Sequence, residues 1–248
     1  MFNRILAQTG FSGAKVDTVL NNSSIYQGGN VEGTVCIVGG SSDQQISKIK
    51  FFVMTQAKVE SDDGYFYQEQ VIQCLEIPHH MRIQAHQKHE VPFVFALPSE
   101  TPITVIAEGC NQSQVWIQTE LDIEFGVDSV DRDYVHVFPI PAVEMMINKF
   151  INHGFNFMKV DVEAGYLSTP SFRSTSGVYQ EIEMRPAGFF DWNSRNIEEI
   201  ELSFIVEGDV VHLLVEVDRH SYGDGYKSVS FPTYVEEYEL DNYFMMVM

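Results

Sequence analysis

Three acidic residues alternate with apolar ones in the middle of the chain, in the stretch Glu120-Leu121-Asp122-Ile123-Glu124-Phe125. Because successive side chains of a β-strand point to opposite faces, Glu120, Asp122 and Glu124 would share one face. Two carboxyl groups on one face can hydrolyse a glycosidic bond, with one as the nucleophile and the other as the general acid. The spacing therefore makes Glu120 and Glu124 candidate catalytic residues.

The same six residues resemble the catalytic strand of jelly-roll β-glucanases, in which two glutamates flank an aspartate. At roughly 3.3 Å per residue the α-carbons of Glu120 and Glu124 lie about 13 Å apart, whereas a retaining mechanism needs carboxyl groups about 5.5 Å apart. The other interpretation is that Leu121, Ile123 and Phe125 form a buried face, while the acids keep the opposite face hydrated. We favour this second interpretation and keep a β-glucanase as the alternative function.

Four histidines, His79, His80, His86 and His89, lie within eleven residues and raise the question of a metal site. Imidazole is a common zinc ligand. No acidic residue or cysteine accompanies these histidines before Glu90, however. We therefore expect a solvated loop that crosses to the next strand, and we predict no metal and no cofactor.

The three cysteines, Cys36, Cys74 and Cys110, are far apart and form no Cys-x-x-Cys pair. Such an arrangement is typical of buried free thiols in a reducing compartment. The first residues lack the apolar segment of a signal peptide, and no stretch approaches the roughly 20 apolar residues that span a bilayer. We therefore expect a cytoplasmic protein without a membrane span.

The chain of 248 residues carries 35 acidic and 15 basic residues, a net charge of -20. The acidic excess is spread over both halves, so neither half offers the basic surface that nucleic acid or an anionic membrane requires. A protein partner with a basic patch fits this charge better. The sequence also lacks a nucleophile elbow, a phosphate-binding loop and a zinc-binding His-Glu-x-x-His helix. We predict a protein that is not an enzyme.

Alternating apolar residues predict an all-β chain, with about seven strands before residue 128. The alternating stretches are Val16–Leu20, Val31–Ile37, Ile49–Val59, Tyr65–Ile77, Val91–Leu97 and Val115–Phe125. Strands at this close spacing are typical of a sandwich. Pro92 lacks the amide hydrogen of a central strand, so its strand should lie at a sheet edge or begin there. We assign residues 1–128 to a first β-sandwich.

Residues 129–141 combine acidic residues with two prolines around a short extended piece, and we interpret them as an interdomain connector. Our hypothesis is that Asp131, Arg132 and Asp133 make charged contacts between the domains and limit their relative motion. A solvated linker is the alternative.

One short helix is predicted directly after the connector, with Pro141 in its first turn and Gly154 at its end. Its apolar stripe consists of Val143, Met146, Ile147, Phe150 and Ile151. Alternation resumes beyond the helix, so residues 142–231 are assigned to a second β-sandwich. The tail, 232–248, is acidic and then apolar, and we expect it to dock on its own chain or on a second subunit.

Taken in chain order, several segments resemble the arrestin-like proteins of the bacterial sporulation-control family (sporulation stage zero, M type). The segments are Gly13–Ile46, the Leu97-Pro98-x-x-Thr101-Pro102 step, Val115–Ile123, Asp131–Tyr134 and Glu216–Arg219. The resemblance covers nearly the whole chain, and the tail after Arg219 departs from it.

The resemblance implies two immunoglobulin-like β-sandwiches side by side, with one short helix at the start of the second. It also implies a non-enzymatic scaffold or regulator with cytoplasmic protein partners, linked to sporulation, cell division or stress response. The strand edges of a sandwich can accept another extended segment, so we expect binding at an edge, either of a partner or of a second copy in a homodimer.

Overall fold

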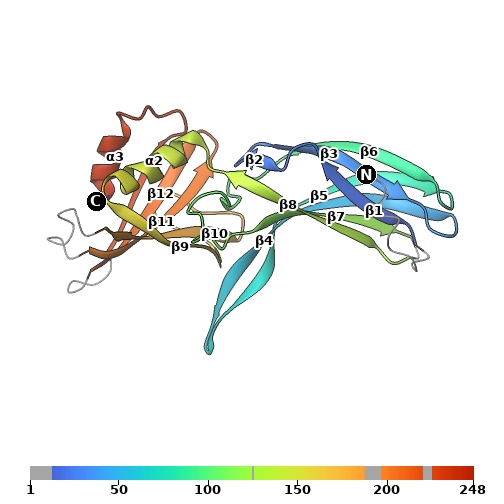
Figure 1. The fold of residues 1–248 in the computed structure, drawn as a ribbon, viewed down its shortest axis with the longest axis horizontal. Helices are drawn as coiled ribbons and strands as arrows, with labels where there is room; N and C mark the ends of the chain where they lie inside the picture. The colour runs from blue at the N-terminus through green and yellow to red at the C-terminus, as the bar shows by residue number, and fades with distance from the viewer. Residues whose placement is uncertain (1–12, 125, 188–196, 220–224) are drawn as a thin grey trace.

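The computed structural model describes residues 13–124, 126–187, 197–219 and 225–248. Its strands are β1 (Lys15–Leu20), β2 (Ser24–Tyr26), β3 (Asn30–Val38), β4 (Gln44–Ser61), β5 (Gly64–Ile83), β6 (Lys88–Ala96), β7 (Val115–Ile123), β8 (Ser129–Phe138), β9 (Phe155–Ala164), β10 (Val178–Pro186), β11 (Ile197–Glu207), β12 (Val210–Arg219) and β13 (Gly225–Pro232). Its helices are α2 (Pro141–Asn152) and α3 (Leu240–Val247). The predicted all-β class is confirmed, and the elements form two lobes along the long axis (Figure 1).

The N-terminal lobe is a sandwich of two sheets. A three-stranded sheet, β1-β3-β6, packs on the strands β5-β4-β7-β8-β2 of a larger sheet, and apolar residues of both sheets share one core. Strand β1 pairs antiparallel with β3, from Lys15 opposite Val38 to Leu20 opposite Gly33, and the two strands contain the alternating stretches Val16–Leu20 and Val31–Ile37 predicted from the sequence. Strand β2 lies between them in sequence and pairs in parallel with β8, an element that the apolar pattern did not reveal.

The strand pattern of this lobe follows the prediction closely. Strands β1 to β7 precede residue 128, the number expected from the alternation. Strand β6 pairs with β3 alone among the described strands, so Pro92 lies in an edge strand. Phe125, the last residue of the predicted alternation, lies outside the described residues.

The segment expected as a connector, 129–141, is folded into the two lobes. Residues Ser129–Phe138 form strand β8, whose register with β7 runs from Leu121 opposite Ser129 to Val115 opposite Val135. The apolar side chains of Val135 and Val137 are buried in the N-terminal core. The N-terminal sheet therefore extends to Phe138, and residues 139 and 140 lead into α2. The division of the chain into domains stays a prediction.

The C-terminal lobe contains a curled antiparallel sheet in the order β13-β12-β11-β10-β9, with α2 and α3 on its inner face (Figure 1). Helix α2 confirms the predicted helix. It begins at Pro141, which needs no amide hydrogen bond at that position, and Gly154 follows its end with a φ of 86°, a left-handed conformation that glycine adopts without strain. Among the described residues, no helix has the length and apolar character needed to cross a membrane.

The tail docks on its own chain through α3, a helix that the sequence analysis did not predict. Leu240, Phe244 and Val247 are buried in the core of the C-terminal lobe. Phe244 packs on Phe150 of α2, with ring centroids 5.0 Å apart. The Lys149 ammonium group donates a hydrogen bond of 2.7 Å to Asp241. Docking in cis covers the apolar end that would be costly to expose.

The long hairpin of β4 and β5 stands at the junction of the lobes and projects away from both (Figure 1). Near its base, Lys58 of β4 pairs in parallel with Glu163 of β9, which joins the sheets of the two lobes. Ala57, Val162 and Val178 form a small buried cluster at the same place. The hairpin therefore belongs to the N-terminal lobe by sequence and contacts the C-terminal lobe at its base.

Candidate functional site

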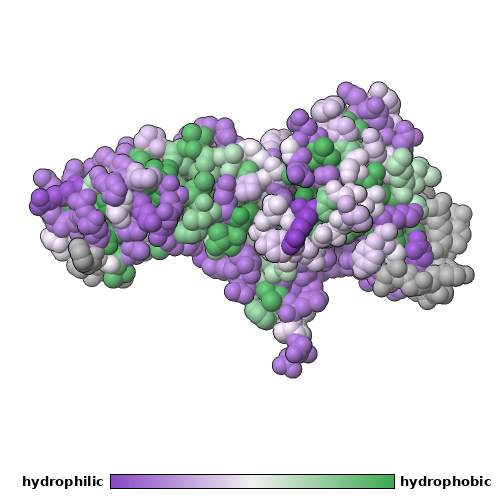
Figure 2. Space-filling model, turned by 180° about the vertical axis from the view of Figure 1, so that it is seen from behind, coloured by the Kyte–Doolittle hydropathy of each residue, from purple (hydrophilic) through white to green (hydrophobic). Residues whose placement is uncertain are grey.

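An unpaired strand edge runs along the projecting hairpin. Strand β5 pairs with β4 from Gly64 to Ile83, and no other described strand pairs with β5. Large side chains near its start are exposed to solvent: Tyr65 is 63% exposed, Phe66 49% and Val71 48%. Figure 2 shows the hairpin standing clear of the body, with hydrophobic residues above a hydrophilic tip. This edge can accept an extended segment of another chain.

Pro78 indicates which backbone groups of β5 face outward. Proline has no N–H, so in a paired strand it occupies positions whose amide would point away from the neighbour. In an antiparallel strand, alternate residues direct their N–H and C=O groups to the same side. Between residues 73 and 78 the register with β4 is regular, so Cys74 and Glu76 share the orientation of Pro78. Their amide groups are available for a further strand.

A second candidate site lies on the outer face of the C-terminal sheet. Strands β9 to β12 alternate buried apolar residues with acidic ones, so one face of the sheet packs on the helices and the other carries the acids. We call this second face the acidic sheet face. Its charged residues are Lys159, Asp161, Glu163, Glu181, Glu183, Glu199, Glu201, Glu216 and Asp218.

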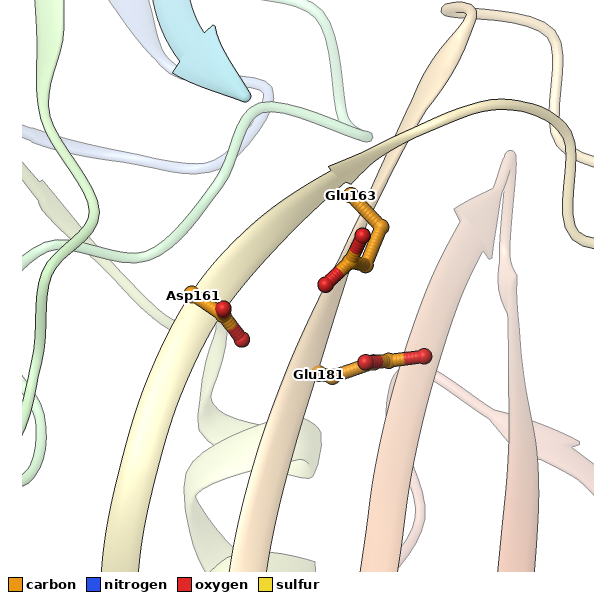
Figure 3. A group of neighbouring side chains, drawn as sticks. All are labelled: Asp161, Glu163 and Glu181. Atoms are coloured by element: carbon orange, nitrogen blue, oxygen red, sulfur yellow. The ribbon is translucent and has the colours of Figure 1, made fainter. Parts of the chain in front are cut away.

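Three carboxyl groups of the acidic sheet face converge where β9 and β10 lie beside the hairpin base. Asp161 and Glu163 are two residues apart on β9, and Glu181 lies opposite Asp161 on β10. One oxygen atom from each carboxyl group lies within 4.8 Å of the other two. Figure 3 shows the Asp161 and Glu163 side chains leaning toward the neighbouring strand, with Glu181 below Glu163 and its carboxyl group extending away from Asp161. Asp161 and Glu163 are 1% and 6% exposed, so the cluster is largely shielded from water.

Two lysines hold part of this negative charge. The Lys58 ammonium group donates to Glu163 at 2.8 Å, and the Lys159 ammonium group donates to Asp161 Oδ2 and lies 3.5 Å from Glu183 Oε1. The second oxygen of Asp161, Oδ1, is buried and has no hydrogen-bond partner. The cluster therefore leaves one buried acceptor unsatisfied.

Burial and mutual repulsion alter the pKa values of two carboxyl groups on this face. Burial, together with the negative charges of Glu201, Glu163 and Asp161, raises the pKa of Glu181 to about 8. Burial and the facing carboxyl groups, first Glu216 and then Glu183, raise the pKa of Glu201 to about 7. Carboxyl groups at such positions keep a proton near neutral pH because the charged form is poorly solvated.

These acids were not among the residues predicted from the sequence, although the pattern that would have indicated them was present. In the segments 160–164, 180–184 and 199–202, acids alternate with the apolar residues that predicted the strands. We interpreted the apolar residues as a core face and made no prediction for the acidic residues that alternate with them. Their convergence also depends on the pairing of β9 with β10, and the alternation within one strand does not specify that pairing.

The acids proposed as alternative catalytic residues lie on an open face of the N-terminal lobe. Asp122 accepts a hydrogen bond of 2.6 Å from Ser47 and lies 3.7 Å from the Lys50 ammonium group. The Ser47 hydrogen bond is the main cause of a lowered pKa of Asp122. Glu120 lies opposite Lys50 and accepts a hydrogen bond from Gln118, while Glu124 follows the end of β7 and is exposed. Leu121 and Ile123 are buried, as expected if the apolar residues of this strand form a buried face and the acids keep the opposite face hydrated.

The histidines do not form the solvated loop that we predicted. His79 and His80 lie within β5, and His89 lies in β6, so only His86 falls in the turn between the strands. The run of apolar residues at Ile77, Met81 and Ile83 continues the β5 alternation through the histidine segment, which the sequence interpretation missed.

The residues of the interdomain hypothesis bond within the N-terminal lobe. Asp131 Oδ2 accepts a hydrogen bond of 2.6 Å from the Thr18 amide. Arg132 forms two hydrogen bonds with Glu69 and lies over the Trp116 ring at 4.5 Å. The side chain of Asp133 on the same strand has a buried oxygen. Strand β8 belongs to the N-terminal sheet, which explains why Asp131 and Arg132 find their partners there.

The thiols are free, as expected, and differ in burial. Cys36 is buried and Cys110 is half-buried, but Cys74 is exposed because its side chain lies on the open face of β5. The prediction of three buried thiols is therefore wrong for Cys74.

Comparisons with known proteins agree along most of the chain. The family model described as SpoOM protein matches residues 2–221. The sporulation-control protein spo0M of Bacillus subtilis (strain 168) is 31% identical over 223 residues, covering 90% of this chain and 82% of that protein. The crystal structure of Spo0M from Bacillus subtilis matches with a TM-score of 0.80 and 28% identity, over 95% of this chain and 99% of that one. The resemblance found in the sequence is confirmed.

Proposed function

Because the chain belongs to the Spo0M family of sporulation-control proteins, we propose that it is a non-enzymatic regulator that acts in the cytoplasm by binding a protein partner. The observation that carries this proposal is the outer edge of β5, a strand of 20 residues with a described strand on one side only. An extended segment of a partner would add to the sheet through main-chain hydrogen bonds, and side chains along the edge would give specificity.

The charge of the protein supports a partner segment that carries basic residues. The net charge is -20, and residues 64–81 of β5 contain glutamates but no lysine or arginine. Glu69 and Glu76 of this edge are exposed, and each already attracts a cation, Arg132 and Lys48 respectively. A basic segment would be steered toward the edge and would compete for these carboxyl groups.

Proline substitution at Cys74 tests the edge. The variant Cys74→Pro removes an outward amide and leaves the hydrogen bonds to β4, so we expect the protein to fold and to lose its partner. The matched control is Cys74→Ala, which removes the same thiol and keeps the amide. The measurement is affinity capture from the native cytoplasm followed by mass spectrometry and by quantification of the partner that is identified. Equal capture by both variants would contradict binding at this edge.

The β-glucanase alternative has less support. Asp122 is bonded to Ser47, Glu120 lies opposite Lys50, and these carboxyl groups lie on an open sheet face rather than converging. A β-glucanase would hydrolyse mixed-linked glucan, and this activity would disappear in the variant Glu120→Gln.

A further inference from the structure

The acidic sheet face carries a cluster of three carboxyl groups that partner binding at the β5 edge would not involve. We propose that Asp161, Glu163 and Glu181 form a binding site for a hard divalent cation of the Ca²⁺ type. The site would lie on β9 and β10 beside the base of the hairpin. The inference concerns a different surface from the β5 edge, and it does not depend on the proposed function.

The spacing of the carboxyl oxygens suits an ion of this size. One oxygen from each residue lies within 4.8 Å of the others. Ca²⁺ binds oxygen at about 2.3–2.6 Å, so ligands on opposite sides of the ion are about 5 Å apart. Mg²⁺ demands near-octahedral geometry, which a strand pair meets less easily. An all-carboxylate donor set also favours a hard cation over zinc or copper.

The unsatisfied oxygen of Asp161 indicates a ligand independently of the acidic composition. Asp161 is 1% exposed, and its Oδ1 has no hydrogen-bond partner, although its Oδ2 accepts from Lys159. A buried acceptor without a partner is destabilising, and most such groups in native proteins are satisfied by protein, water or an ion. The side chain is directed toward Glu163 and Glu181 (Figure 3), so an ion between them would satisfy it.

The surrounding charge also favours a cation. The carboxyl groups of Glu183 and Glu201 lie on the same face in register with Lys159, so five carboxyl groups face two ammonium groups, those of Lys58 and Lys159. The ammonium groups compete with an ion for Asp161 and Glu163. Lys159 already lies 3.5 Å from Glu183, so it can retain a carboxylate partner when an ion occupies Asp161. Tyr67 of β5 and Tyr179 of β10 complete the titratable surroundings.

The test is a titration of the whole chain with Ca²⁺, read out by thermal unfolding, and with Tb³⁺, read out by tyrosine-sensitised luminescence. Tyr179 lies on the same face two residues from Glu181 and provides the sensitiser. We expect one saturable site in about 150 mM KCl, which screens weak binding to the acidic surface. The variant Glu181→Gln should weaken binding at least tenfold, because it removes a carboxyl ligand, which releases its proton when the ion binds, but keeps the side-chain shape.

Two further variants make the result decisive. Glu216→Gln makes the same substitution on β12 of the same face and should leave the affinity unchanged. Lys159→Gln removes the competing ammonium group and should tighten binding severalfold, an effect in the opposite direction that loss of structure does not produce. The proposal is overturned if no saturable binding is found, or if Glu181→Gln and Glu216→Gln weaken it equally, which would indicate diffuse attraction to the protein's negative charge.

Discussion

At the scale of single residues, carboxyl groups on the acidic sheet face lie close enough to repel one another. Glu183, Glu201 and Glu216 lie directly opposite one another on β10, β11 and β12. Like charges in such cross-strand positions destabilise a sheet. The raised pKa of Glu201, about 7, shows how the fold reduces this cost, since a protonated carboxyl group neither repels its neighbours nor needs full solvation.

This arrangement predicts a pH-dependent stability. The unfolded pKa of Glu201 is about 4.5 and the folded pKa is about 7, so the folded protein binds the extra proton between these values. The free energy of unfolding should therefore fall as the pH rises from about 4.5 to about 7 and change little above that pH. The variant Glu201→Gln has no titrating group at position 201, so it should match the wild type near pH 4. At pH 8 we expect it to be more stable by about 1–2 kcal/mol, after a reduction for solvent screening.

Chemical denaturation of both proteins in EDTA at several pH values measures the effect. All other titratable residues are common to both proteins, so the difference between the two curves isolates Glu201. Parallel curves would contradict the role given to this residue.

Individual residues were predictable from the sequence where one strand decides their environment. Leu121 and Ile123 are buried because alternation along β7 fixes their face. The partners of Arg132 and Asp161 depend on which strands lie next to β8 and β9, and alternation within one strand carries no information on that choice. For this reason the partners of Arg132 and the surroundings of Asp161 could not be predicted from the sequence.

At the scale of elements, α3 is the clearest case of a short segment stabilised by tertiary contacts. Its eight residues are too few for a helix that is stable alone, and its N-cap Glu239 forms no capping hydrogen bond with its side chain. The apolar residues Leu240, Phe244 and Val247 recur at helical spacing, so the signal was present. We interpreted this segment as an apolar tail because nothing in its flanks marks a helix start.

Truncation of Phe244 tests how much the docked tail contributes. Phe244 is 1% exposed and packs on Phe150 and on His153, whose ring centroid lies 4.1 Å away. Replacing a buried phenylalanine with alanine costs about 3–5 kcal/mol when the site cannot collapse. We expect Phe244→Ala to lower the free energy of unfolding by about 3 kcal/mol, measured by urea denaturation.

The matched control is Met246→Ala on the exposed side of the same helix, where Met246 is 64% exposed. This variant should change stability by less than about 0.5 kcal/mol. A similarly small effect of Phe244→Ala would mean that α3 undocks at little cost and that the tail is available to a second subunit.

Long elements were predicted from the sequence more accurately than short ones. Strands β4 and β7 and helix α2 have periodic apolar residues over at least nine positions, and all three were predicted. Strand β2 has three residues, too few for a pattern, and it exists because β8 offers an edge. The segment expected as a connector forms β8 because it pairs with the edge of β7 and because Val135 and Val137 complete the N-terminal core.

At the scale of the whole molecule, the cis-docked tail leaves the strand edges as the basis for the predicted homodimer. Two copies can pair antiparallel through β5, because such pairing is symmetric and uses the same surface of each chain. A partner segment would compete for this edge, so dimer and complex should exclude one another. The dimer brings two negatively charged chains together, whereas the complex joins opposite charges, so the two can be distinguished by their response to salt.

Salt should act in opposite directions on the two associations. Each copy carries a net charge of -20, so raising the salt concentration from about 50 mM to about 500 mM screens the repulsion and should strengthen the dimer. Binding of a basic segment is attractive and should weaken over the same range. Sedimentation velocity at several protein concentrations measures the dimer, and Cys74→Pro should abolish it while Cys74→Ala does not. A monomer at every salt and protein concentration would contradict the homodimer and leave the β5 edge to a partner alone.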